Sequence, residues 1–149
     1  MKSIRLFVLS AALLAAAAGD AHALEYKSVG AEPAILYDAP SARGRKVFVA
    51  PRGMPVEVVL TYGEWTKVRD VTGGLAWVES KMLAPARNVV VRVPKAIIRA
   101  AADETSAVVF TADKGVLLQL LDASGGDWVK VRHRDGLTGF VKAASVWGE

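Results

Sequence analysis

Short segments of apolar and β-branched residues, separated by turn residues, recur along most of the chain. In the first half they cover residues 47–49, 56–60, 65–69 and 75–78. Stretches that contain Gly, Pro or Asp bound them, and the second half has similar turns at 122–127 and 134–136. Segments of this kind are typical of β-strands, and no window beyond residue 23 keeps the 3.6-residue period of an amphipathic helix. The pattern predicts an all-β protein.

The same pattern occurs twice, at an interval of 62 to 63 residues. VGAEPAIL at 29–36 is echoed by VRVPKAII at 91–98, and WTKVR at 65–69 is echoed by WVKVR at 128–132. Two further blocks, which begin at residues 52 and 74, recur in the same order. Four blocks in one order at nearly constant spacing indicate a duplicated structural unit.

Each repeat has room for five short strands and one long irregular connection near its start. We therefore expect one small closed barrel in residues 24–86 and a second in 87–149, because closure removes exposed sheet edges. The segment between them, APARN at 84–88, is short. Such a short linker predicts that the two barrels sit against each other.

The first 23 residues carry a different pattern. A cationic start with Lys2 and Arg5 precedes an uncharged run at 6–18, and Ala21 and Ala23 form a small-x-small ending. This order is typical of a cleavable secretory signal peptide, and the run is shorter than the roughly 20 residues that span a bilayer. We expect cleavage after Ala23, a periplasmic product and no stable membrane insertion. A secreted or cell-wall-associated product is the alternative for localisation, and an uncleaved anchor or a buried helix is the alternative for the segment.

Composition argues against several classes of function. The 149 residues include no cysteine, so the barrels depend on their apolar cores alone. The formal net charge of +4 is small and its residues are scattered, which does not fit a nucleic-acid-binding protein. Beyond residue 23, His133 is the only histidine, so neither a familiar metal-ligand set nor a hydrolytic triad is indicated. We expect no cofactor, no metal and no catalytic activity.

Three motifs of the first repeat resemble the bacterial SH3-like domain. They are G-x-P-V-E-V from residue 53, W-x-K-V-R-D from residue 65 and G-x-A-W-V from residue 74. The second repeat is similar to the same family and ends with G-F-V from residue 139 and V-W-G from residue 146. The resemblance covers nearly all of the chain beyond residue 23. It implies two tandem SH3-like barrels in an exported or envelope-associated binding module, whose ligand is cell-wall material or a protein.

The two repeats differ at their openings. The first reads ILYDAPS from residue 35, which is similar to the A-L-Y-D-Y opening of eukaryotic SH3 domains, whose tyrosines line a groove for proline-rich peptides. The second has Arg99 where the first has Tyr37. A groove built on Tyr37 would therefore exist in the first repeat only.

Period-2 alternation identifies the candidate ligand-binding residues. In the strand at 65–69, Thr66 and Val68 share one face while Trp65 and the two cationic residues share the other. If the valines fill the barrel, the aromatic residues lie on its rim, where rings beside cations suit sugars, peptide stems or proline-rich segments. The candidate residues are Tyr37, Tyr62, Trp65, Trp77 and Trp128.

The alternative role of these aromatic residues is structural. Trp65 and Trp128 could cover a barrel mouth, and Trp77 and Phe140 could cement the two copies together. Tyr62, next to a turn glycine, needs no function, because single exposed aromatics are common.

The functional hypothesis is a non-catalytic envelope binding module that recognises peptidoglycan or other cell-wall material through rim aromatics. The alternative hypothesis is a periplasmic adaptor that binds another protein. Neither hypothesis defines an oligomeric state.

Overall fold

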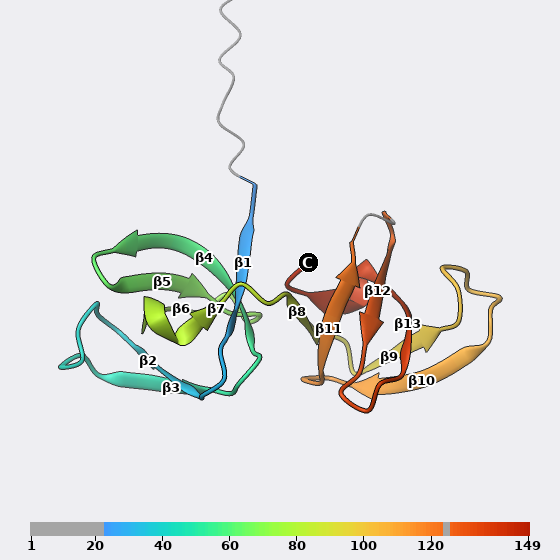
Figure 1. Cartoon of the computed structure of the whole chain (residues 1–149), viewed down its shortest axis with the longest axis horizontal. Coiled ribbons are helices and arrows are strands. Elements are labelled where there is room, and N and C mark those ends of the chain that lie inside the picture. Colours follow the sequence, from blue (N-terminus) through green and yellow to red (C-terminus); the bar gives the residue numbers. More distant parts are fainter. Residues whose placement is uncertain (1–22, 124–125) are drawn as a thin grey trace, which may run out of the picture.

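The computed structural model describes residues 23–123 and 126–149 (Figure 1). Residues 1–22 of the predicted signal peptide lie outside the described part of the chain, so its cleavage stays a prediction. The described residues form two seven-stranded antiparallel sheets. No helix within these residues is long and apolar enough to cross a membrane.

The first sheet and the short 3-10 helix η1 come from residues 25–84. Its elements are β1 (Glu25–Val29), β2 (Ala34–Tyr37), β3 (Lys46–Ala50), β4 (Pro55–Tyr62), β5 (Trp65–Arg69), β6 (Leu75–Glu79), η1 (Ser80–Met82) and β7 (Leu83–Ala84). The strands are ordered β3-β2-β6-β5-β4-β1-β7.

The second sheet repeats this order with each strand seven places later in the chain. Its elements are β8 (Asn88–Val91), β9 (Lys95–Arg99), β10 (Val108–Asp113), β11 (Leu117–Asp122), β12 (Trp128–Arg132), β13 (Thr138–Lys142), η2 (Ala143–Ser145) and β14 (Val146–Trp147). The order is β10-β9-β13-β12-β11-β8-β14. The prediction of two tandem all-β, SH3-like barrels is confirmed. We call them barrel 1 and barrel 2.

The number of strands differs from the sequence prediction. Each barrel has seven strands, not five, because the first strand pairs with a two-residue strand at the end of the unit. In barrel 1 this pairing joins Val29 to Leu83, which are far apart in sequence. Among the described residues β3 pairs with β2 alone, so the ladder is not continuous around the barrel.

Alternation places the valines inside, as the sequence predicts. Val56, Val68 and Val78 are fully buried in the core of barrel 1. Their counterparts in the core of barrel 2 are Leu118, Val131 and Val141. Burying each such side chain contributes about 1.5–3 kcal/mol, so these two cores hold the barrels in the absence of cysteine.

The two barrels contact each other through the segment that joins them. Residues 85–87 separate β7 from β8. Asn88 Nδ2 donates a 2.9 Å hydrogen bond to the carbonyl oxygen of Gly53. The rings of Tyr26 and Trp147 meet edge to face with their centroids 5.2 Å apart. The copies therefore pack on each other, with β8 close to barrel 1 (Figure 1).

Candidate functional site

Four of the candidate aromatic residues lie on neighbouring strands of barrel 1. The ring centroids of Tyr37 and Trp65 are 5.5 Å apart and their planes are nearly perpendicular, at 87°. Trp77 lies directly across the sheet from Tyr37, where β2 and β6 pair. Edge-to-face aromatic pairs are worth about 0.5–1.5 kcal/mol beyond the area they bury. We call Tyr37, Tyr62, Trp65 and Trp77 the aromatic rim.

The members of the aromatic rim differ in exposure. Tyr37 is only 7% exposed, whereas Trp65 and Trp77 are half-buried. Tyr62, which lies opposite Trp65 in the β4–β5 register, is 68% exposed. Tyr37 thus supports the ring of Trp65 from below, and the surface that a ligand could touch comes from the two tryptophans and Tyr62.

Polar groups border the aromatic rim. Lys67, across the ladder from Trp77, holds its ammonium group 5.8 Å from the centre of that indole ring. A cation–π contact such as that of Lys67 with Trp77 contributes about 0.5–1 kcal/mol at exposed sites. Across the ladder from Trp65 lies Glu79, and the Nζ of Lys81 is 3.1 Å from its Oε2. The rim therefore combines aromatic faces with the ammonium group of Lys67 and the ion pair of Glu79 with Lys81.

The corresponding rim of barrel 2 is built differently. Trp128 occupies the position of Trp65, but Arg99 replaces Tyr37 and donates a 2.9 Å hydrogen bond from Nη1 to the carbonyl of Ser106. A hollow of about 280 Å³ beside Trp128 includes the ion pair between Glu104 and Lys142. The hydrogen bond from Lys142 lowers the pKa of Glu104. Trp128 therefore lies apart from the other four candidates, in charged surroundings.

Residues other than Trp77 and Phe140 make the aromatic contact between the barrels. Trp77 lies beside Lys67, and Phe140 lies beside Lys130 at 5.9 Å. The inter-barrel contact is instead made by Tyr26 and Trp147.

Sequence reasoning missed these two contact residues. The repeat did contain a signal for them, because in register Tyr26 matches Asn88 and Trp147 matches Ala84. An aromatic residue that occurs in one copy only, at matched positions, marks a contact that the two copies do not share.

Arg87 secures this contact from the connecting segment. Its guanidinium lies 5.6 Å from the ring centre of Tyr26, and Nη2 donates a 3.2 Å hydrogen bond to the carbonyl of Gly148. Burial, more than the carboxylates of Glu57 and Glu149, raises the pKa of Tyr26. The phenol of Tyr26 is thus held in its neutral form at the junction of the barrels.

His133 and Asp135 form a pair in the turn that follows β12 of barrel 2. His133 Nδ1 is 3.0 Å from an oxygen of Asp135, and its ring packs on Phe110 with a centroid separation of 5.7 Å. The backbone N–H of Leu137, more than His133, lowers the pKa of Asp135. Within 23–123 and 126–149, no three His, Cys, Asp or Glu residues are grouped so that they could hold a metal ion.

Comparison with known families agrees with this architecture. The sequence model of the bacterial SH3 domain matches residues 30–85 and, a second time, residues 92–148. The chain belongs to the bacterial SH3 domain family. Bacterial SH3 domains are commonly cell-wall binding modules, typically non-catalytic, and they usually occur in exported or cell-wall proteins.

The solved structures that resemble this chain are those of longer proteins. NlpC2 and NlpC1 from Trichomonas vaginalis are 11% and 13% identical, cover 85% and 89% of this bacterial SH3 chain and 49% of their own, each with a TM-score of 0.40. An NlpC/P60 family protein from Bacillus cereus ATCC 10987 is 16% identical over 83% of this chain and 56% of its own, with a TM-score of 0.37. This chain thus spans about half the length of these proteins. No curated protein matches it.

Proposed function

We propose that this protein is a non-catalytic binding module of the cell envelope that recognises peptidoglycan or other cell-wall material through the aromatic rim of barrel 1. The observation that carries the proposal is the grouping of Trp65, Trp77 and Tyr62 over the buried ring of Tyr37. Family membership supports the class of ligand. The proposal places the protein in the periplasm, which depends on the predicted signal peptide.

The chemistry of the rim matches that class of ligand. Aromatic faces pack against the C–H faces of sugar rings, and a few polar groups then fix the orientation. The ammonium of Lys67, at the edge of Trp77, can pair with a carboxylate of a peptide stem. Neither contact requires a catalytic group.

Barrel 1 rather than barrel 2 carries this site in the proposal. Tyr37 supports Trp65 from below, whereas the matching Arg99 donates its hydrogen bond to Ser106 and leaves Trp128 without an aromatic partner among the described residues. The rim of barrel 2 is bordered by the Glu104–Lys142 ion pair, and Arg99 stands there in place of the ring of Tyr37.

Sedimentation with purified cell-wall sacculi tests the proposal. The purified protein should pellet with sacculi at low salt, and Trp65→Ala should move most of it to the supernatant. Tyr62→Ser is a second variant that cannot unfold the barrel, because the ring of Tyr62 is largely in solvent. Trp128→Ala is the matched control and should pellet like the wild type.

Two results would contradict the proposal. One is a wild-type protein that stays wholly in the supernatant. The other is equal loss of binding in the Trp65 and Trp128 variants while circular dichroism shows both folded. A stoichiometric protein captured by the wild type and lost with Trp65→Ala would favour the adaptor hypothesis in its place.

A further inference from the structure

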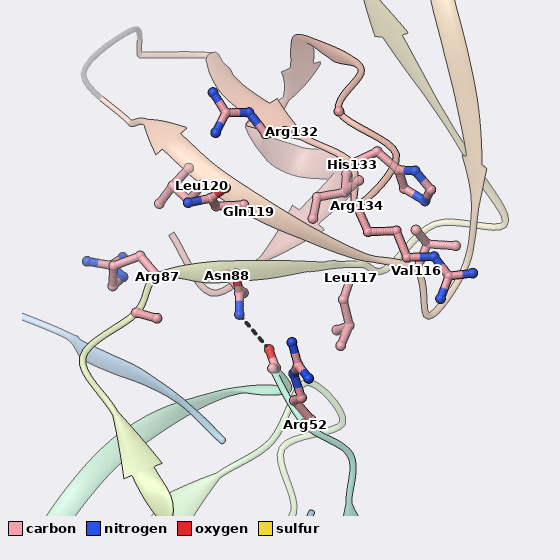
Figure 2. Close-up of a pocket in the computed structure, with 14 residues that line it drawn as sticks. Arg52, Arg87, Asn88, Val116, Leu117, Gln119, Leu120, Arg132, His133 and Arg134 are labelled. Carbon is pink, nitrogen blue, oxygen red and sulfur yellow. Dashed lines mark hydrogen bonds between the residues drawn. The ribbon is translucent and has the colours of Figure 1, made fainter. Parts of the chain in front are cut away.

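A pocket of about 900 Å³ lies between the two barrels and is lined by residues of both (Figure 2). Its lining includes four arginines and a histidine, and none of the lining residues that the structure describes is acidic. These five basic residues are Arg52, Arg87, Arg132, His133 and Arg134. We call the space that they line the basic pocket.

Both barrels contribute to the basic pocket. Arg52 belongs to the turn that precedes β4 in barrel 1, and Arg87 belongs to the connecting segment. Arg132 ends β12, and the turn after it carries His133 and Arg134. Figure 2 shows Arg52 and Arg87 on one side of β8 and β11 and the other three residues on the barrel 2 side. The basic residues, although distant in sequence, therefore border one space.

The two repeats differ in the residue that lies across the ladder from one of these arginines, Arg132. In barrel 1, Arg69 faces Glu57 across the ladder, and its Nη1 donates 3.0 Å hydrogen bonds to both carboxylate oxygens. In barrel 2 the matching register pairs Arg132 with Gln119. The exchange of a carboxylate for an amide leaves the charge of Arg132 without an anionic partner within the described ranges.

Arg52 and Arg87 also lack a carboxylate partner among the described residues, whereas His133 and Arg134 lie beside Asp135. Arg52 makes no ion pair or side-chain hydrogen bond with residues 23–123 or 126–149. The guanidinium group of Arg87 contacts the ring of Tyr26 and donates a hydrogen bond to the carbonyl of Gly148, and neither partner is an anion. The carboxylate nearest to Arg134 in sequence is Asp135, which pairs with His133.

The same face of barrel 1 is already filled. There Tyr26 and Pro55 are covered by Trp147 and Gly148 from the end of barrel 2. Their counterparts in barrel 2, Asn88 and Leu117, line the basic pocket. One face of the repeat thus packs against aromatic and terminal residues in barrel 1, whereas in barrel 2 it contacts Gly53 and otherwise borders the pocket.

We propose that the basic pocket binds an anionic ligand that carries two or more phosphate groups. Guanidinium groups match phosphate oxygens with paired hydrogen bonds, and several unneutralised arginines favour a ligand with several negative charges. A volume of about 900 Å³ is far larger than one phosphate group and accommodates a short chain of them. The site is separate from the aromatic rim, and the ligand is a soluble oligophosphate or a phosphodiester segment of an envelope polymer.

Isothermal titration calorimetry tests the proposal, with inorganic tripolyphosphate and a short glycerol-phosphate oligomer as the two probes. We expect saturable binding of at least one probe at low salt, and the tighter probe identifies the source of the phosphate. The double variant Arg52→Gln/Arg132→Gln should weaken binding by about a hundredfold or more, because two charge-assisted contacts to phosphate are lost. Both side chains are exposed, so the variant keeps the fold.

Arg43→Gln/Arg92→Gln is the control with the same net charge, since neither arginine lines the pocket. It should bind the probes like the wild type, and Trp65→Ala should do so too. The proposal is overturned if neither probe binds, or if the control loses as much affinity as the pocket variant. It is also overturned if triglutamate, a carboxylate chain of similar charge, binds as tightly as tripolyphosphate.

Discussion

Gly139 lies in β13, where barrel 2 has least room for a side chain. A Cβ added there would lie 2.5 Å from Ile98 Cγ2 and 2.7 Å from the carbonyl oxygen of Arg99. Its φ is not in the left-handed region, so space is the only obstacle to alanine. In barrel 1 the same position is Ala76, which is buried in the core without difficulty.

The expected effect of Gly139→Ala follows from two opposing contributions. Overpacking a filled core costs about 1–3 kcal/mol, and the backbone oxygen of Arg99 can move only if β9 moves. Restricting the unfolded chain returns about 0.4–1 kcal/mol. We therefore expect a net loss of about 1–2 kcal/mol in the free energy of unfolding. For a barrel of this size, each kcal/mol lowers the melting temperature by roughly 4–8 °C if the barrels unfold separately.

Urea denaturation followed by circular dichroism measures this loss. Ala76→Gly is the matched control in barrel 1, where removing the buried methyl group should cost about 1–2 kcal/mol through added backbone freedom and lost apolar burial. A Gly139→Ala protein that is as stable as the wild type, or more stable, would refute the reasoning. That result would mean that β9 retreats from β13 at no cost.

Three further predictions concern the barrel surfaces. Arg69→Met should lower the unfolding free energy by about 1–2 kcal/mol in urea titrations, because it strands the buried carboxylate of Glu57, whereas Arg132→Met should change it little. Since the pKa of Tyr26 is raised, its contribution to stability is present below about pH 10 and lost as pH rises through the raised value; Tyr26→Phe should remove that loss in unfolding titrations from pH 8 to 11. Trp147→Ala should enlarge the radius of gyration in small-angle scattering, with near-native circular dichroism, because the barrels lose their aromatic contact.

The inside and outside of β5, β6, β12 and β13 could be predicted from sequence because alternation is a local property, whereas Val47, Phe48 and Val49 of β3 are all exposed. Alternation placed Val68 and Val131 in the cores and Trp65 at a rim, and the structure agrees. The pairing of β1 with β7 could not be predicted, because it joins the two ends of a unit and depends on the curvature of the whole sheet.

The basic pocket illustrates a second limit of sequence reasoning. Its arginines extend from Arg52 to Arg134, and along the chain they look scattered in a protein with a formal net charge of only +4. Folding brings these arginines to the same pocket, and the edge-to-face contact of Tyr26 with Trp147 joins the two barrels that line it. Charge density at a site is set by the tertiary arrangement, and neither net charge nor spacing along the chain reveals it.

Duplication explains how one scaffold can hold two different surfaces. Three matched positions on neighbouring strands, Tyr26, Glu57 and Arg69 in barrel 1, become Asn88, Gln119 and Arg132 in barrel 2. The first set is neutral overall and carries a ring, which suits a packing contact. The second set keeps the cation, loses the carboxylate and exchanges the ring for an amide. Since Val68 and Val78 keep valine counterparts in Val131 and Val141, these exchanges change the chemistry of the face while the core beneath it stays apolar.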